Sequence, residues 1–502
     1  QVMRDGELVY GRGYGLASLE HRVPISTTTV FRTGSVGKQF TALAVLLAEA
    51  AGHLSLDDDI RDHLPELANL EVPVTVEQLV HHTSGLRDYL DLMYLAGYRE
   101  EAHYDNRQVL EVLAGQQTLN FEPGSDYLYS NTGYFLLSQI VERATGKTLR
   151  DWSHEAIFAP LGMDASHFHD DPWMVVPNRA YGYSRREEGG FQVNMTTLEM
   201  VGDGGVFTTI EDMVAWERNY LEPKVGGPEV LAKRLATGEL TDGTPQIYAA
   251  GLTVRTHRGL PVVQHGGAFV GFRAATVRFP EDRLAVHTLC NVGDSDPMAL
   301  AHQVAELYLG DRLEAEVESP PEAASAQELA DLVGTWVDPR SVRPIEVTLE
   351  EGELRVSFGG EPWTVVESTE EGREFDLYRD GQRWGLVVDP KSVGGGLSVL
   401  REGRRPIAFE RVEPAETDVT AYLGRYRSEE LGATWEIAMG EDGQLIARLP
   451  PLDDAPLQSS YRDAFTWDWG HAVFERDSDG RVIAMRFGTG RAQRLRMVRV
   501  VD

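Results

Sequence analysis

Residues 31–39, FRTGSVGKQ, stand directly before residues 40–51, FTALAVLLAEAA, whose apolar spacing predicts a helix. If this helix begins at Ser35, the side chains of Ser35 and Lys38 are three residues apart and lie on the same side. The Ser35 hydroxyl then stands at a helix N-terminus, within reach of an amine that can take its proton. A Ser-x-x-Lys pattern is short, and a helix-capping serine beside a solvated lysine is the competing interpretation.

A second motif, PGSDYLYSNTG at residues 123–133, precedes another predicted helix. The Tyr129 phenol is a suitable proton carrier opposite a serine–lysine pair, because a nearby ammonium lowers the pKa of a phenol. The Asn131 side chain can donate to a substrate carbonyl. Taken alone, the motif is explained more simply by a packed tyrosine next to a helix cap.

A third motif, HGG at residues 265–267, follows the strand pattern of residues 261–264. Its two glycines remove side chains where a strand lines a cleft, so that a substrate backbone can approach closely. His265 beside them can donate toward Tyr129 or toward the substrate. A lone histidine next to glycine is more often a turn residue.

Five motifs in a fixed order carry a resemblance to a known family. They are FRTGSVGKQ at 31–39, LVHHTSGL at 79–86, PGSDYLYSNTG at 123–133, GDGGVFTT at 202–209 and HGG at 265–267. Together they resemble the serine β-lactamase and penicillin-binding-protein-like family, in particular its branch of class C β-lactamases, D-aminopeptidases and esterases. The resemblance covers about residues 1–310. It implies an α+β catalytic domain, in which an antiparallel sheet with flanking helices packs against an all-α lobe.

The resemblance also implies a role for each catalytic residue. Ser35 is the nucleophile that becomes acylated, and Lys38 and Tyr129 move its proton. The backbone N–H groups of Ser35 and Ala268 form an oxyanion hole. Tyr129 stands where transpeptidases have a serine, and His265 stands where they have a lysine. A histidine in place of that lysine is common in esterases and aminopeptidases. Residues 82–85, HTSG, resemble a structural turn of the family and receive no catalytic role.

Beyond residue 315 the composition changes, because six of the nine tryptophans lie there. Short alternating segments predict strands, and LVGTW at 332–336 recurs as YLGRY at 422–426. The pattern predicts two small antiparallel β-barrels after an acidic linker. We expect a catalytic domain over residues 1–315 and barrels over 328–412 and 418–502.

Three-domain members of the D-aminopeptidase branch resemble this arrangement, and in them a loop of the last barrel reaches the catalytic cleft. We expect residues 449–456, LPPLDDAP, to be that loop here. Asp453 or Asp454 would then bind a substrate ammonium group, and an exposed acidic turn is the alternative. The residues expected to bind substrate are Asn131, Gly267, Ala268, Asp453 and Asp454.

Composition excludes several classes of function. The chain has 502 residues and a formal net charge of −32, which disfavours nucleic acids and anionic membrane surfaces as partners. No apolar run approaches the roughly 18 residues that span a bilayer. One cysteine and no metal-ligand spacing argue against a disulfide, a metal site or another cofactor. The expected partner is a small peptide, amide or ester, and a homodimer is left open. The sequence favours the cytoplasm slightly and leaves export open.

Two classes of function remain. The first is a serine hydrolase that works through an acyl-enzyme. Its most favoured form is a D-stereospecific aminopeptidase or amidase for short substrates with a free N-terminus, and a D-Ala-D-Ala carboxypeptidase, a β-lactamase or a carboxylesterase is the alternative. The second class is an inactive homologue that binds peptidoglycan-like ligands. The intact set of Ser35, Lys38 and Tyr129 favours the hydrolase.

Overall fold

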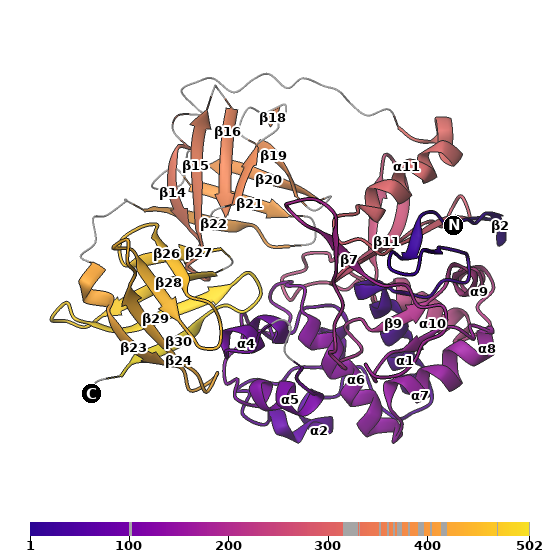
Figure 1. Ribbon diagram of the computed structural model, residues 1–502, viewed down its shortest axis with the longest axis horizontal. Coiled ribbons are helices and arrows are strands. Elements are labelled where there is room, and N and C mark those ends of the chain that lie inside the picture. The colour runs from indigo at the N-terminus through magenta and orange to yellow at the C-terminus, as the bar shows by residue number, and fades with distance from the viewer. Residues whose placement is uncertain are drawn as a thin grey trace.

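The structure is a computed structural model, shown in Figure 1. It describes residues 1–99, 103–314, 330, 332–350, 353–358, 361–364, 367–368, 374–379, 382–389, 396–401, 404–412, 419–468 and 470–500. The first 314 residues form a helical lobe and an antiparallel sheet, and the later residues form two β units. No helix in these ranges is long and apolar enough to cross a membrane.

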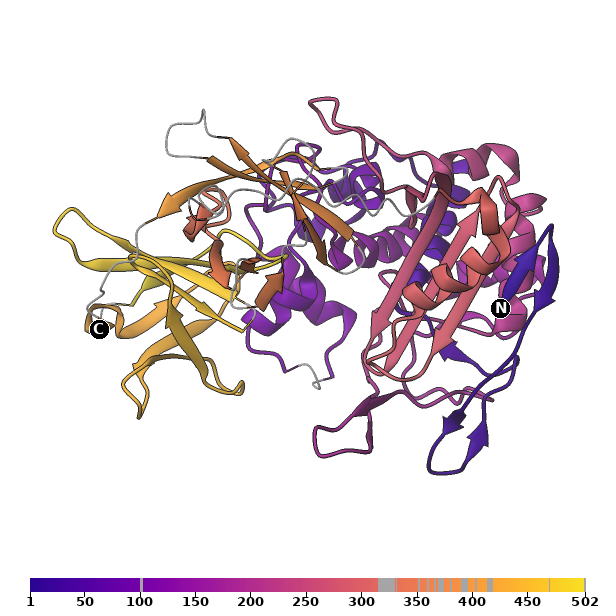
Figure 2. The same ribbon diagram turned by 90° about the horizontal axis from the view of Figure 1, so that it is seen from above.

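A six-stranded antiparallel sheet has the order β10-β11-β12-β13-β1-β2, so that the N-terminal strands complete one edge. Its strands are β1 Val2–Arg4, β2 Glu7–Tyr10, β10 Thr253–His257, β11 Leu260–Phe269, β12 Phe272–Phe279 and β13 Leu284–Cys290. Helix α11 (Pro297–Leu309) covers one face of this sheet (Figure 2). Its Ala301 and Ala305 pack among buried valines of the sheet. Helix α9 (Ile210–Leu221) contributes Glu217, which pairs with Arg278 of β12 at 2.6 Å, with both side chains buried.

Two long helices form the centre of the helical lobe, α1 (Lys38–Ala50) and α6 (Asn131–Thr145). Both are buried over most of their length, α1 through a run of apolar residues and α6 chiefly through its first two thirds. The other helices are α2 Ile60–His63, α3 Val76–Val80, α4 Tyr89–Leu95, α5 Asn106–Ala114, α7 Leu149–Ser153, α8 Ala159–Leu161 and α10 Gly227–Leu235. Three small sheets join β3 Leu16–Ser18 to β4 Val23–Pro24, β5 Phe31–Arg32 to β9 Val206–Thr208 and β6 His167–Phe168, and β7 Tyr183–Arg185 to β8 Phe191–Val193.

The two C-terminal β units confirm the predicted all-β region. The second unit is a closed antiparallel barrel of β23 Gly424–Arg427, β24 Thr434–Met439, β25 Leu445–Arg448, β26 Ala455–Ser459, β27 Ala464–Trp467, β28 Gly470–Arg476, β29 Val482–Thr489 and β30 Leu495–Arg499. The first is a nine-stranded antiparallel sheet in the order β17-β16-β15-β14-β22-β21-β20-β19-β18, which over the described residues is not a closed barrel. Its strands are β14 Gly334–Val337, β15 Pro344–Glu350, β16 Glu353–Phe358, β17 Glu361–Thr364, β18 Glu367–Ser368, β19 Glu374–Arg379, β20 Gln382–Asp389, β21 Gly396–Arg401 and β22 Ile407–Val412.

Equivalent contacts confirm the predicted repeat. Gly334 and Gly424 open the first strand of each unit, with φ values of 146° and 142°. A Cβ atom at either glycine would contact an arginine of the last strand, Arg411 in the first unit and Arg499 in the second. The same two arginines lie over the rings of equivalent aromatic residues, Trp336 and Tyr426.

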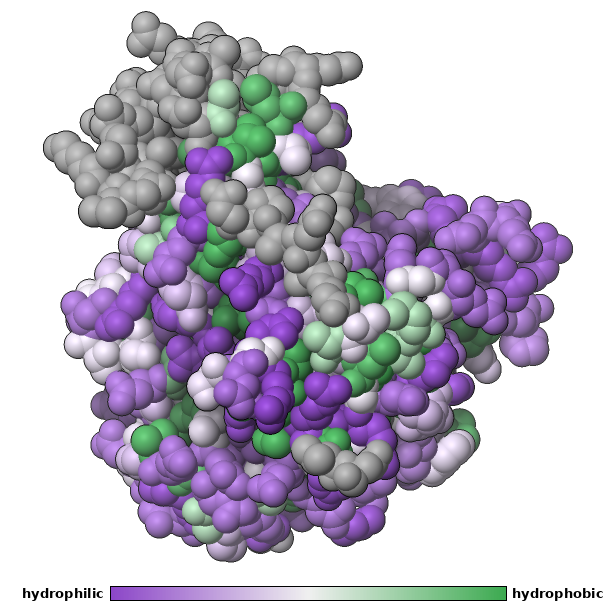
Figure 3. Space-filling model, turned by 90° about the vertical axis from the view of Figure 1, so that its left-hand side faces the viewer, coloured by the Kyte–Doolittle hydropathy of each residue, from purple (hydrophilic) through white to green (hydrophobic). Residues whose placement is uncertain are grey.

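The barrel packs directly against the helical lobe. Apolar residues of both parts form one continuous core cluster, and the Trp435 indole donates to the Leu95 carbonyl at the end of α4 (3.1 Å). Arg87 is buried at the same contact and pairs with Glu430 of the barrel at 2.7 Å. On the barrel side of the molecule, most of the coloured surface is hydrophilic, with small apolar patches between (Figure 3).

Candidate active site

Ser35 lies in a single 3₁₀ turn, Gly34–Gly37, that leads directly into α1. Residues three apart eclipse in a 3₁₀ turn, and the Lys38 side chain accordingly lies beside Ser35, with Nζ 3.2 Å from Oγ. The predicted side-by-side arrangement of the two residues is confirmed. The predicted start of the helix at Ser35 is wrong, because α1 begins at Lys38 after this turn.

Lys38 is completely buried, and burial lowers the pKa of its amine to about 7, against the opposing effect of the Asp203 and Asp88 charges. Its Nζ also donates to the Asn131 side-chain oxygen (2.9 Å) and to the Asp203 carbonyl. A neutral amine has two N–H bonds and one lone pair. When the two carbonyl oxygens take the N–H bonds, the lone pair is left for the Ser35 hydroxyl.

Tyr129 is positioned by His82. The His82 carbonyl accepts the Leu128 N–H (3.0 Å), and the ring Nδ1 accepts the Ser130 N–H (3.2 Å). The His82 and Tyr129 rings pack with their centres 4.3 Å apart, and Lys38 Nζ lies 4.7 Å from the centre of the Tyr129 ring. His82 therefore shapes the catalytic loop, a structural role that its turn motif predicted.

The expected low pKa of Tyr129 is wrong. Burial raises the pKa of this phenol well above 10, although the nearby Ser35 hydroxyl and the Arg491 charge oppose the shift. The Tyr129 hydroxyl is buried, and it forms no hydrogen bond to any residue that the structure describes. Tyr129 is therefore a protonated phenol at neutral pH, with its O–H available to a reacting group.

Asn131, the first residue of α6, links the lysine to the helical lobe. Its side-chain oxygen accepts from Lys38, and its backbone N–H donates to the buried Asp88 carboxylate at 2.7 Å. The side-chain NH₂ group is therefore the part of Asn131 that can donate to a substrate carbonyl.

The C-terminal half of β11 lies against the Ser35 turn. A Cβ atom on Gly267 would stand 2.0 Å from the Thr33 carbonyl oxygen and 3.1 Å from the Ser35 nitrogen. A Cβ atom on Gly34, whose φ is +52°, would stand 2.8 Å from the Ala268 nitrogen. Gly267 thus admits the backbone of the nucleophile turn, whereas the sequence suggested that it admits the substrate.

The register of β11 directs the Ala268 N–H away from the sheet. Phe269 and Phe272 flank a two-residue turn and form the hydrogen-bonded pair, so that the next pair, Ala268 and Arg273, is not hydrogen-bonded. Strand β10 pairs with β11 only as far as Gln264. The Ala268 N–H is therefore bonded to neither neighbouring strand, and the Ala268 nitrogen lies next to the Ser35 turn, 2.8 Å from a Cβ atom built on Gly34, as the predicted oxyanion hole requires.

His265 is held by a residue that sequence reasoning missed. Burial lowers the pKa of its imidazole to about 4, so the ring is neutral. It donates Nδ1–H to the Gly266 carbonyl (2.6 Å), and Nε2 accepts from the Tyr248 hydroxyl (3.0 Å). The expected donation toward Tyr129 is absent from this arrangement, because both ring nitrogens are engaged and the two ring centres are 6.1 Å apart.

Comparison of the sequence with known proteins shows the family to which the chain belongs. Residues 1–309 match the family model described as Beta-lactamase. The chain belongs to the β-lactamase family. It is 29% identical to a D-aminopeptidase of Gluconobacter oxydans and 30% identical to one of Cereibacter sphaeroides, in each case over 99% of this chain and 95% of the relative. These relatives and the family identify the protein as a serine hydrolase.

Solved structures share the fold. A penicillin-binding protein homologue from Pyrococcus abyssi, described as octameric, is 22% identical and superposes with a TM-score of 0.58 over 82% of this chain and 94% of its own. SurE with D-Leu is 23% identical, with a TM-score of 0.56 and the same two coverages. These likenesses support the β-lactamase and penicillin-binding-protein-like fold.

This β-lactamase-family site contains further residues that the sequence did not single out as functional. Asp203 was visible inside the GDGG motif, and its carbonyl holds Lys38 while its carboxylate accepts from Tyr89 (3.0 Å). Asp88, Tyr248 and Arg491 stand in no motif, and no signal in a single sequence connects them to Ser35. No group of three or more potential metal ligands occurs among the described residues.

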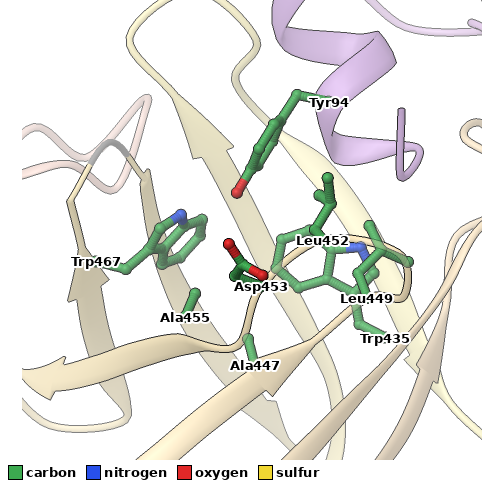
Figure 4. Close-up of a pocket in the computed structure, with 8 residues that line it drawn as sticks. All are labelled: Tyr94, Trp435, Ala447, Leu449, Leu452, Asp453, Ala455 and Trp467. Carbon is green, nitrogen blue, oxygen red and sulfur yellow. The ribbon is translucent and has the colours of Figure 1, made fainter. Parts of the chain in front are cut away.

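Asp453 lies at the contact between the barrel and α4, and Asp454 is exposed next to it. Asp453 lines a small pocket with Tyr94, Trp435 and Trp467, in which the Tyr94 hydroxyl points toward it (Figure 4). Asp454 pairs with Arg448 at 3.0 Å. The structure does not bring these carboxylates together with the Ser35 group. The barrel hairpin that does reach it contains Arg491, whose guanidinium carbon lies 5.2 Å from the centre of the Tyr129 ring.

Proposed function

We propose that the protein is a D-stereospecific aminopeptidase or amidase that cleaves short peptides and amides through an acyl-enzyme on Ser35. The D-aminopeptidase relatives support this substrate class, because the similarity extends over 99% of this chain, both C-terminal β units included. The observation that carries the chemistry is the buried Lys38 amine, whose N–H bonds are occupied by two carbonyl oxygens.

In the proposed acylation step, Lys38 takes the Ser35 proton while Oγ attacks the substrate carbonyl carbon. The carbonyl oxygen becomes an oxyanion and accepts from the N–H groups of Ser35 and Ala268. As the tetrahedral intermediate collapses, the carbon–nitrogen bond breaks, and Tyr129 gives its proton to the leaving amine. The proton held by Lys38 returns to the Tyr129 oxygen, which restores both groups.

Deacylation uses the same groups in the same roles, with water in place of Ser35. A water molecule attacks the ester carbonyl, its proton passes to Lys38, and the Ser35 oxygen leaves with a proton from Tyr129. The proton held by Lys38 then returns to the Tyr129 oxygen, which restores both groups. The product is a free carboxylic acid. His265 and Tyr248 hold strand β11 against the site, and the Asn131 NH₂ group orients the substrate carbonyl.

The test of this function is labelling combined with a substrate screen. Intact-protein mass spectrometry with a fluorophosphonate should show one added phosphonyl group in the wild-type protein and none in Ser35→Ala. Ser26→Ala, which changes an exposed serine, is the control and should label normally. Loss of the nucleophile should lower the hydrolysis rate by several orders of magnitude. Wild-type activity in Ser35→Ala would disprove the assignment.

The screen distinguishes the members of the family. D-aminoacyl anilides, L-aminoacyl anilides, p-nitrophenyl esters and nitrocefin should be compared under one condition. A preference for D-aminoacyl anilides supports the proposed activity, whereas nitrocefin or ester hydrolysis alone favours a β-lactamase or an esterase. A protein that neither labels nor turns over any of them is the inactive homologue.

A further inference from the structure

A hairpin of the C-terminal barrel lies against the helical lobe beside the catalytic group. It comprises residues 489–494, from the last residue of β29 to the start of β30. The Arg491 carbonyl accepts the backbone N–H of Asp88 (3.2 Å) and the side-chain amide of Asn120 (2.9 Å). The Thr489 hydroxyl donates to the Asp91 carboxylate of α4. These hydrogen bonds fix the backbone of the hairpin, and therefore the origin of the Arg491 side chain.

The Arg491 side chain extends from the hairpin over the ring of Tyr129, which Lys38 Nζ also contacts. Its ion pair with the Asp88 carboxylate is long, at 3.9 Å, and Asp88 already accepts the Asn131 N–H. Within the part of the chain that the structure describes, no acceptor lies within hydrogen-bond distance of the Arg491 guanidinium, and 46% of the side chain is exposed. Donors of this guanidinium are therefore open to a ligand at the site.

A second arginine, contributed by the unit of the nine-stranded sheet, lies beside the loop of residues 126–129 that contains Tyr129. Arg404, ahead of β22, lies over the ring of Tyr127 with its guanidinium carbon 5.0 Å from the ring centre. Asp126, the acidic residue of this loop, forms an ion pair with Arg340, in which a guanidinium nitrogen lies 3.6 Å from a carboxylate oxygen. Arg404 and Arg491 are near enough for the Arg491 charge to add to the effect of burial in lowering the pKa of Arg404. Two β units thus place positive charge beside the catalytic loop of a chain with a net charge of −32.

We propose that Arg491, assisted by Arg404, binds a carboxylate of the substrate, so that the enzyme selects negative charge close to the scissile bond. This proposal rests on the proposed function, because it takes Ser35 as the reacting centre. A guanidinium presents paired N–H donors that match the two oxygens of a carboxylate. The carboxylate belongs either to the acyl part of the substrate or to the leaving group. If the acidic loop instead bound an ammonium group through Asp453 or Asp454, the enzyme would prefer positively charged substrates.

Two pairs of substrates separate the possible sources of the carboxylate. The acyl pair is mono-p-nitrophenyl succinate and p-nitrophenyl butyrate, which differ mainly by one carboxylate. The leaving-group pair is D-alanyl-glycine and D-alanyl-glycinamide. For each pair the measurement is the ratio of kcat/KM for the anionic member to that for the neutral member. We expect this ratio to exceed about ten in the pair whose carboxylate reaches Arg491, since a charge-assisted hydrogen bond is worth about that factor or more.

Three variants test the residue. Arg491→Gln should lower the favoured ratio at least about tenfold, and Arg491→Lys should retain part of it, because a lysine keeps the charge and loses the paired donors. Arg496→Gln is the matched control, because it removes one arginine charge from the adjoining strand β30, where Arg496 pairs with Glu475 (2.9 Å). Its ratios should equal those of the wild type. Thermal unfolding of each variant checks that the hairpin change leaves the protein folded.

The outcomes separate this proposal from the proposed function. Ser35 labelling by a neutral fluorophosphonate does not depend on a carboxylate site, and its loss would overturn the proposed function and this proposal together. Normal labelling with a ratio at or below one in both pairs would overturn the carboxylate site alone. An unchanged ratio in Arg491→Gln would do the same, even where the wild type prefers anionic substrates.

Discussion

At the scale of single residues, burial has opposite effects on the two proton-transfer groups of the site. It lowers the pKa of the Lys38 amine to about 7 and raises the pKa of the Tyr129 phenol well above 10. Both groups are therefore neutral just above pH 7, which is the combination that a base and an acid in one reaction require. Lys38 is assigned as the base and Tyr129 as the acid on this ground.

The assignment predicts the pH dependence of the reaction. Below pH about 7 the Lys38 amine becomes protonated and loses the lone pair that accepts the Ser35 proton. We expect kcat/KM for p-nitrophenyl butyrate to fall about tenfold for each pH unit below 7 and to level off above pH 8. Stopped-flow or steady-state rates between pH 5 and pH 9 measure this limb. A flat profile across that range would contradict a lysine base of this pKa.

The residues of the site differ in how well the sequence alone predicts their role. Ser35 and Lys38 were predictable together, because one helical turn places them side by side. Tyr129 and Asn131 were predictable from a family motif. Tyr248, in contrast, meets His265 only through the packing of a loop against β11, and its position in the sequence carries no periodic or turn signal.

At the scale of elements, the contact between β11 and the Ser35 turn depends on one glycine. A Cβ atom on Gly267 would overlap the Thr33 carbonyl oxygen at 2.0 Å, whereas one on the neighbouring Gly266 would touch only the end of the Met298 side chain at 3.4 Å. Gly267→Ala should therefore push the turn away from the strand and lower kcat/KM at least about a hundredfold, as the loss of an oxyanion donor does.

Gly266→Ala is the matched control for that variant. The flexible Met298 side chain can move aside, so that kcat/KM should stay within about threefold of the wild type. Parallel measurement of activity and fluorophosphonate labelling in the two variants decides the point. Equal losses in both would show that the strand, and not the close approach at Gly267, controls the site.

The type of most elements was predictable, and their closure was not. Apolar periodicity indicated α1 and α6, and alternation indicated the C-terminal strands. Whether a unit of short strands closes into a barrel depends on the pairing of its first and last strands, as β23 pairs with β30 here. Such a pairing joins residues more than seventy positions apart, and the alternation of a single strand does not encode it. The repeat was detectable because Gly334 and Gly424 occupy the same special position in both units.

At the scale of the whole molecule, two adjacent residues connect the barrel to the catalytic group. The Arg87 side chain points into the barrel contact, while the Asp88 side chain accepts the N–H of Asn131, which in turn holds Lys38. The sequence predicts that an acidic loop at residues 449–456 reaches the site. The structure instead places residues 489–494 there. The orientation in which the barrel packs against α4 determines which of its loops lies next to the site.

The last prediction tests this docking through Arg87. Its guanidinium is 1% exposed and donates to the Glu430 carboxylate, the Gln493 carbonyl and the Thr118 carbonyl, all within 2.8 Å. Arg87→Met would remove the buried partner of these part-buried acceptors, which costs about 3 kcal/mol in the free energy of unfolding. We expect a clear decrease in Tm by calorimetry.

The same variant should also change selectivity, because the Gln493 carbonyl belongs to the hairpin that carries Arg491. The ratio of kcat/KM for anionic to neutral substrates should fall toward that of Arg491→Gln, while Ser35 still labels, since α1 and β11 hold it without the barrel. Arg143→Met, which breaks the exposed pair with Glu66, is the control and should change the free energy of unfolding by no more than about 1 kcal/mol. Equal effects of the two substitutions would mean that the barrel is held by its apolar contact with α4 alone, and that its hairpin stays in the site without Arg87.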